Sequence, residues 1–192
     1  MSAVLVALAY LAGSIPFGVL VTRWLLGVDV RAQGSGNIGA TNVARVGGKK
    51  LGVVVLLLDA LKGAGPAWAA VALAPGARWW HATVGLAAFL GHVFPVWLRF
   101  RGGKGVATAL GVLLVLEPVA AGAGFVVYAV LFAIWRVSSA GSLAGGVVVT
   151  AVAWLGPWPE EYAALTSVLL GMMLYTHRGN IRRLIKHTEK PV

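Results

Sequence analysis

The sequence predicts an all-α integral membrane protein with about seven transmembrane helices, its N-terminus on the outer side of the membrane and its C-terminus in the cytoplasm. Of the 192 residues, 59% are hydrophobic and only 11% are charged, whereas a soluble domain carries about 25% charged residues. The 16 Lys and Arg residues are concentrated in a few segments between long apolar runs, as in membrane proteins that keep their cations on the cytoplasmic side. The length suits one helical bundle, so we expect a single domain over residues 1–192.

The predicted spans are apolar runs close to the ~20 residues that cross the hydrocarbon core. No Lys or Arg precedes the first run, which favours an uncleaved helix over a signal peptide. The fourth and sixth runs are short, and Gly and Pro punctuate their ends, so five spans are an alternative to seven. The runs cover residues 4–26, 51–73, 82–98, 106–116, 119–135, 143–155 and 162–175.

The cations set the predicted orientation. With the N-terminus outside, every Lys and Arg lies on the cytoplasmic side except Lys62, inside the second run, and Arg78. Glu117, Glu160 and Glu161 fall on the outside. This asymmetry supports the orientation, and it brings three polar segments that are far apart in the sequence to the cytoplasmic face.

The first polar segment, GSGNIGATN at residues 34–42, mixes glycines with neutral donors. Glycines let a ligand approach the main chain, and successive backbone N–H groups in such a turn bind anions. Arg45, just beyond, offers a planar fork of donors suited to phosphate. A flexible connecting loop is the alternative, but linkers are rarely so rich in polar side chains. The candidate ligands are Ser35, Asn37, Thr41, Asn42 and Arg45.

The second polar segment, FRGGKGVAT at residues 100–108, surrounds Lys104 with Gly102, Gly103 and Gly105. A helix is expected to begin directly after it, and a helix N-terminus favours an anion. The order of residues differs from that of a nucleotide P-loop, and no strand precedes it. The segment therefore indicates a phosphate site; a connecting turn with cations at the membrane surface is the alternative.

The third polar segment, HRGNIRRLIKHTEK from residue 177, places His177 and Asn180 on one helical face. His177 is the best candidate for a proton acceptor near neutral pH. The cations Arg182, Arg183 and Lys186 are better explained as contacts to anionic lipid headgroups.

Other polar residues have mainly structural interpretations. Asp59 and Lys62 are expected to form an internal ion pair, because isolated charges are costly in hydrocarbon. His92 is expected to be a hydrogen-bonded structural histidine. Helix capping and ligand contact are both open for the three serines at the inner end of the sixth run, Ser138, Ser139 and Ser142.

Composition excludes several kinds of site. The chain has no cysteine, which rules out disulfides and cysteine metal sites, and its four histidines include no close pair at metal-ligand spacing. We therefore expect no metal and no cofactor. A net charge of +10 would suggest nucleic acid in a soluble protein, but here it reflects the cytoplasmic cations.

The polar segments closely resemble the three signature motifs of the bacterial PlsY family. The matching stretches are GSGNIGATNVAR, GHVFPVWLRFRGGKGVAT and HRGNIRRLIKHTE, and LAYLAGSIPFG and LDALKG are also similar. PlsY proteins are acyl-phosphate:glycerol-3-phosphate acyltransferases with seven transmembrane helices and a cytoplasmic active site. The resemblance implies transfer of a fatty acyl group from acyl phosphate to the 1-hydroxyl of sn-glycerol 3-phosphate. The products would be lysophosphatidate and phosphate, in the first acylation step of phospholipid synthesis.

The resemblance also implies residue roles. The first motif gives functional importance to Ser35 and Arg45, the third to His177 and Asn180, and the glycine loop around Lys104 is associated with glycerol 3-phosphate. We expect these five residues to be catalytic. The expected substrate contacts are Asn37, Thr41, Asn42, Gly102, Gly103, Gly105 and Ser142.

The third motif contains a glutamate, and the reaction needs a proton acceptor. The family's motif glutamate matches Glu189, which is thought to support structure, but KHTEK departs from the usual glycine before it. The proton acceptor is either His177 or a substrate phosphate, whose second pKa is about 6. Because phosphate is a good leaving group, no acyl-enzyme intermediate is expected.

The expected setting is the bacterial cytoplasmic (inner) membrane, with membrane lipid as a further partner and no nucleic acid or obligatory protein partner. A phosphate transporter is the main rival, but transporters usually place the site near the midplane and show internal repeats. A lipid-binding scaffold without turnover would leave the Ser and Asn content of the first loop unexplained. The acyltransferase class with a His-x4-Asp pair is excluded, because none of the four histidines has an Asp five positions later.

Overall fold

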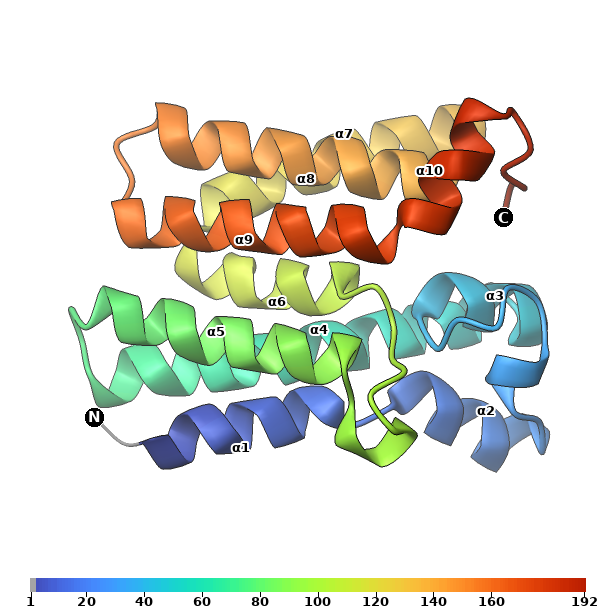
Figure 1. Cartoon of the computed structure of the whole chain (residues 1–192), viewed down its shortest axis with the longest axis horizontal. Helices are drawn as coiled ribbons and strands as arrows, with labels where there is room; N and C mark the ends of the chain where they lie inside the picture. The colour runs from blue at the N-terminus through green and yellow to red at the C-terminus, as the bar shows by residue number, and fades with distance from the viewer. Residues whose placement is uncertain (1–2) are drawn as a thin grey trace.

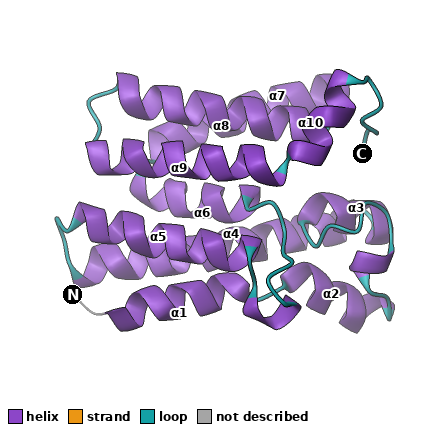
Figure 2. Ribbon diagram, in the orientation of Figure 1, coloured by secondary structure: helices purple, strands orange, loops and turns teal. Residues whose placement is uncertain are grey.

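The structure is a computed structural model that describes residues 3–192; Met1 and Ser2, at the predicted external N-terminus, lie outside the described residues. Residues 3–192 form helices and connecting loops without a strand (Figure 2), which confirms the all-α prediction. The helices are α1 Ala3–Ser14, α2 Phe17–Leu26, η1 Val30–Ala32, α3 Ala40–Gly47, α4 Lys49–Leu73, α5 Arg78–Val93, η2 Val96–Leu98, α6 Val106–Leu116, α7 Pro118–Trp135, α8 Ser138–Leu155, α9 Glu160–Thr176 and α10 Arg178–Ile185.

The long helices lie side by side and run back and forth along the long direction of the molecule (Figure 1). The short helices α2, α3 and α10 gather at one end together with the C-terminus, whereas the described chain starts at the opposite end. We call the end with α2, α3, α10 and their adjoining loops the polar end. All three polar segments of the sequence therefore meet at one end of the bundle.

Within residues 3–192, five segments are long and apolar enough to cross a membrane: Ala3–Leu26, Lys49–Leu73, Arg78–Leu98, Pro118–Trp135 and Ser138–Leu155. The other two predicted runs correspond to α6, with 11 residues, and α9, with 17. Two boundaries were predicted wrongly. The sixth run is not short, because its helix starts at Ser138 and has 18 residues; the serines occupy its first turns. The third helix starts earlier, at Arg78, and ends at Val93, since a proline two residues later cannot continue it.

A proline breaks the first span. Pro16 lacks the N–H that would continue the helix, and it separates α1 from α2. Lys62 of α4 donates a hydrogen bond from Nζ to the carbonyl oxygen of Ile15 at this break, at 2.7 Å. The same Nζ lies 2.7 Å from Oδ1 of Asp59, and both side chains are buried. The predicted internal ion pair is therefore present, and it also satisfies a carbonyl group at the break.

Small residues let the helices approach closely, as is common in membranes. A Cβ atom added to Gly111 of α6 would lie 1.9 Å from the carbonyl oxygen of Ala60 of α4, and one on Gly13 of α1 would lie 2.0 Å from that of Ala88 of α5. Large apolar side chains cover much of the outer surface of the bundle. An exposed apolar surface of this extent fits an integral membrane protein.

Candidate active site

A cavity of about 870 Å³ lies at the polar end and extends between α6, α7, α8 and α9. All three polar segments contribute to its wall. The predicted site residues that line it are Ser35, Asn37, Thr41, Asn42, Arg45, Lys104, Gly105, Ser142, His177 and Asn180. The structure thus brings together residues that are more than 140 positions apart in the sequence, for example Ser35 and Asn180.

Asn42 organises the first loop. Its side chain is buried; Oδ1 accepts from the backbone N–H of Ser35 at 2.8 Å, and Nδ2 donates to the carbonyl oxygens of Val30, Gln33 and Asn37 at 2.9–3.1 Å. These bonds use both N–H groups of the amide and one lone pair of its oxygen. Asn42 therefore shapes the loop from behind, and its predicted substrate contact stays a prediction.

The other polar side chains of this segment differ in how many of their hydrogen-bonding groups are already paired. Asn37 accepts from the N–H of Gly39 through Oδ1 at 2.9 Å, which closes a turn before α3. Ser35 is exposed at the cavity, and its hydroxyl makes no hydrogen bond within residues 3–192. Arg45, on α3, donates from Nη2 to the carbonyl oxygen of Lys190 at 3.2 Å. Ser35, Arg45 and the side-chain N–H groups of Asn37, which make no hydrogen bond within residues 3–192, are the donors of this segment left for a ligand.

The glycine loop before α6 divides into two parts. Gly102 and Gly103 donate their N–H groups to the carbonyl oxygens of Val93 and His92, at 3.1 and 3.0 Å. A Cβ on Gly103 would lie 2.1 Å from Nε2 of His92. Neither glycine lines the cavity, so these two predicted substrate contacts instead pack the loop against the end of α5.

Gly105 and Lys104 face the cavity. Gly105 is the N-cap of α6 with φ +84°, a left-handed conformation that favours glycine. The backbone carbonyl oxygen of Lys104 accepts a hydrogen bond from Oγ1 of Thr176 at 3.3 Å, which connects the loop to α9. Burial, reinforced by the charges of Arg183 and Arg45 and partly offset by Glu189, lowers the pKa of Lys104 to about 8. Its ammonium group is therefore charged at neutral pH and makes no ion pair within the described residues.

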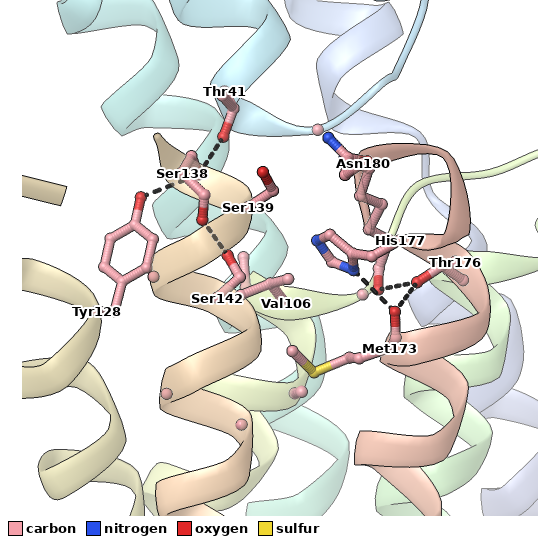
Figure 3. A pocket seen from close by; sticks show the side chains of 18 of the residues that line it. Thr41, Val106, Tyr128, Ser138, Ser139, Ser142, Met173, Thr176, His177 and Asn180 are labelled. Atoms are coloured by element: carbon pink, nitrogen blue, oxygen red, sulfur yellow. Dashed lines mark hydrogen bonds between the residues drawn. The ribbon is translucent and has the colours of Figure 1, made fainter. Parts of the chain in front are cut away.

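His177 joins α9 to α10 and is almost fully buried, with 1% of its surface exposed. Its Nδ1 lies 2.8 Å from the carbonyl oxygen of Met173. Because a carbonyl oxygen only accepts, Nδ1 carries the proton, and Nε2 keeps a free lone pair. Burial and the nearby charge of Lys104 lower the pKa of His177 to about 4, so the ring is neutral at pH 7. Figure 3 shows the ring pointing into the cavity between α9 and α8.

Glu189 connects the third segment to α8. It accepts a short hydrogen bond from Nδ2 of Asn180, one of 2.9 Å from Ser139 and an ion-pair hydrogen bond of 2.5 Å from Nε of Arg183. Burial opposes ionisation, but these three donors hold the pKa of Glu189 below its usual value. The arrangement fits the structural role implied for this glutamate. It also leaves the carbonyl oxygen of the Asn180 amide free to accept from a ligand.

The serines of α8 meet the first loop. Ser138 lies 3.1 Å from the hydroxyl of Thr41 and 3.3 Å from that of Tyr128, and its carbonyl oxygen accepts from Ser142 at 2.8 Å (Figure 3). The sequence left open whether these serines cap a helix or touch a ligand. No side-chain cap forms at this helix start; Ser138, Ser139 and Ser142 line the cavity instead.

The deep part of the cavity was not predicted. Below the polar groups its wall is apolar and contains many small residues, among them Ala109, Leu113, Gly145, Leu169 and Met173. The signal in the sequence was the frequency of Gly and Ala on the facing helices, but this pattern equally predicts close helix packing. The described residues contain no group of three His, Asp or Glu residues suited to a metal ion.

The chain is similar to known proteins over nearly its whole length. The family model for glycerol-3-phosphate acyltransferase matches residues 3–187. A glycerol-3-phosphate acyltransferase from Myxococcus xanthus is 63% identical over 190 residues, covering 99% of both chains. One from Syntrophotalea carbinolica is 45% identical, covering 94% of this chain and 92% of the relative.

Solved structures show the same fold. A crystal structure of PlsY (YgiH), an integral membrane glycerol 3-phosphate acyltransferase, in its glycerol 3-phosphate form superimposes with a TM-score of 0.94 at 42% identity, covering 98% of this chain and 94% of the other. The lysophosphatidic acid form of PlsY gives a TM-score of 0.91 at 40% identity, covering 98% and 93%. The chain therefore belongs to the PlsY family of integral membrane glycerol-3-phosphate acyltransferases.

Proposed function

We propose that the chain transfers a fatty acyl group from acyl phosphate to the 1-hydroxyl of sn-glycerol 3-phosphate, producing lysophosphatidate and phosphate. The reaction would take place at the cytoplasmic face of the bacterial inner membrane. One observation carries this proposal: a single cavity joins a cationic wall at the polar end to an apolar interior between the helices. Phosphate groups suit the first part, and a fatty acyl chain suits the second.

The cations of the polar end support two phosphate-bearing substrates. Arg45 and Lys104 both line the cavity, and α6 begins directly after Gly105, so its free N–H groups favour an anion nearby. Arg45 offers a planar set of donors and Lys104 a compact charge. We assign them to the phosphate groups, with the hydroxyl of Ser35 and loop N–H groups as donors to the oxygen that becomes negative during attack.

In the proposed reaction, the 1-hydroxyl oxygen of glycerol 3-phosphate attacks the acyl carbonyl carbon. The bond from that carbon to the bridging oxygen of acyl phosphate breaks, and phosphate departs with the bonding electrons. The hydroxyl proton passes either to Nε2 of His177 or to a substrate phosphate. Because Nδ1 of His177 already donates to Met173, Nε2 is held ready as an acceptor.

Replacing His177 with glutamine distinguishes the two proton acceptors. In kcat/KM for glycerol 3-phosphate, protonation of the substrate phosphate should lower the rate below pH ~6, and protonation of His177 should steepen this fall near pH 4, since its pKa is about 4. If His177 is the base, His177→Gln lowers kcat by roughly 100-fold or more and abolishes the steeper limb. A change confined to KM, with kcat nearly unchanged, would assign the proton to the substrate.

The acyl donor is tested by offering acyl phosphate, acyl-CoA and acyl carrier protein in parallel to the purified protein with glycerol 3-phosphate. We expect lysophosphatidate from acyl phosphate alone, because only this donor releases a phosphate that Arg45 and Lys104 can hold. Chromatography with mass spectrometry of the lipid product provides the measurement, and the same mixtures without the protein provide the control for uncatalysed transfer. Product from acyl-CoA but not from acyl phosphate would refute the proposed donor.

A further inference from the structure

A second cavity of about 800 Å³ lies on the other side of the two catalytic loops. It shares no lining residue with the first cavity. Gly36 and Ile38 contribute to its wall from the first loop, and Gly102 contributes from the glycine loop. Gly36 and Ile38 alternate in sequence with Ser35 and Asn37, which line the first cavity, and Gly102 lies two positions before Lys104, which also lines it. Each loop therefore has one face on each cavity.

The second cavity is cationic. Its wall contains Arg31, Arg99 and Arg101, with Asp29 as the acidic side chain. The negative charge of Asp29 is already balanced by two arginines. Nε and Nη2 of Arg31 lie 2.9 and 2.6 Å from Oδ1 and Oδ2 of Asp29, and Nη2 of Arg23 lies 2.7 Å from Oδ2. These donors hold the pKa of Asp29 far below its usual value, despite the opposing effect of burial. The Asp29 carboxylate therefore fixes Arg31 in place and leaves the cavity with a net positive charge.

Arg99 and Arg101 have no partner of their own. Both are exposed, and neither guanidinium makes a hydrogen bond or ion pair within residues 3–192. The backbone here is strained, because Arg99 and Phe100 are consecutive non-glycine residues in the left-handed region, with φ of 52° and 61°. Such strain often accompanies binding sites, and hydrogen bonds from Phe100 N to Pro95 O and Arg101 N to Leu98 O hold it in place.

One aromatic side chain, Trp97, lies in the wall of this cationic cavity. Trp97 and the neighbouring Phe100 are 61% and 59% exposed. Trp97 lies near the end of the candidate membrane span Arg78–Leu98, and Phe100 follows that span by two positions. Tryptophan and arginine at that level are typical of the boundary between lipid tails and headgroups, and basic pockets there bind anionic headgroups.

From these contacts we infer that the second cavity binds the headgroup of an anionic phospholipid, with Arg99 and Arg101 on the phosphate and Trp97 against the upper acyl chain. The same chemistry would attract free phosphate, but a soluble anion would gain nothing from the exposed Trp97 side chain. A bound headgroup would brace both catalytic loops from behind and thereby favour their substrate-binding arrangement. The inference depends on the proposed membrane orientation but not on the acyl donor.

The test uses the full-length protein in vesicles of phosphatidylcholine alone or mixed with phosphatidylglycerol. The variant R99Q/R101Q removes two charges from the cavity, and K49Q/K50Q removes two exposed charges at the start of α4, outside both cavities. Phosphatidylglycerol that remains bound after mild detergent extraction is measured by native mass spectrometry. We expect R99Q/R101Q to retain roughly tenfold less than the unmodified protein, and K49Q/K50Q and the charge-preserving R99K/R101K to retain nearly as much as it.

Equal loss in R99Q/R101Q and K49Q/K50Q would show general surface attraction and overturn the site. Displacement of the retained lipid by inorganic phosphate would assign the cavity to a soluble anion instead. Phosphatidylglycerol should also lower the KM for glycerol 3-phosphate of K49Q/K50Q but not of R99Q/R101Q. An identical lipid effect in both variants would overturn the coupling to the loops. Lipid retention needs no turnover, so a wrong acyl donor would leave this result intact.

Discussion

Replacing Lys104 with alanine is expected to lower kcat/KM for glycerol 3-phosphate roughly 10- to 150-fold. A hydrogen bond to a charged group contributes ~1.5–3 kcal/mol, and each 1.4 kcal/mol corresponds to a factor of ten. Lys104 faces the cavity with its ammonium unpaired, so a substrate phosphate would be its first partner. Steady-state kinetics with varied glycerol 3-phosphate measures the effect, which should appear mainly in KM.

The pH dependence of the same residue gives an independent check. Because the pKa of Lys104 is lowered to about 8, its charge is present below pH 8 and is lost as the pH rises through this value. For the unmodified protein, kcat/KM should therefore fall above pH 8. Lys104→Arg keeps the charge at all accessible pH values and should remove this alkaline limb. Unchanged kinetics in Lys104→Ala, or an alkaline limb that persists in Lys104→Arg, would exclude Lys104 from the phosphate site.

Replacing Gly105 with alanine is expected to reduce activity at least tenfold. The left-handed conformation at φ +84° costs a residue with a Cβ atom ~1–2 kcal/mol. In addition, that Cβ would lie 2.1 Å from Cε2 of Phe89, a fully buried side chain. The loop must move to relieve the overlap, and Lys104 would move with it.

Gly122→Ala is the matched control for this change. Gly122 lies within α7, and an added Cβ would meet no atom within 4 Å; alanine is also the better helix former by ~1 kcal/mol. Activity and thermal unfolding in detergent should be unchanged or slightly improved in this variant. Comparable losses of activity in Gly105→Ala and Gly122→Ala would mean that the geometry of the glycine loop is unimportant.

Much of the architecture was predictable because charge and hydropathy act over long segments. The uneven distribution of Lys and Arg along the sequence predicted that the three polar segments lie on the same side of the membrane, and in the structure they lie at one end of the bundle. The cost of isolated charges in hydrocarbon predicted the pair of Asp59 and Lys62. Helix ends were less predictable, because serines at the start of α8 look like loop residues in the sequence while the backbone is already helical.

Individual residue roles in the site depended on contacts that a sequence does not contain. Asn42 and Ser35 belong to the same polar motif, yet the N–H groups of the Asn42 amide donate within the loop while the hydroxyl of Ser35 makes no hydrogen bond within residues 3–192. Likewise, Gly103 packs against His92 while Gly105, two residues later, lines the cavity. Which face of a loop each residue occupies is decided by tertiary packing rather than by residue type.

The hydrogen bond from Nδ1 of His177 to Met173 limits how the imidazole is regenerated between turnovers. With one ring nitrogen fixed on a carbonyl oxygen, the ring cannot pass a proton through to bulk water on its far side. A proton accepted at Nε2 must leave by the route through which it arrived, and the outgoing phosphate is a suitable carrier. If His177 is the base, resetting the enzyme and expelling phosphate become one event, and kcat should then show a solvent isotope effect even when acyl transfer itself is fast.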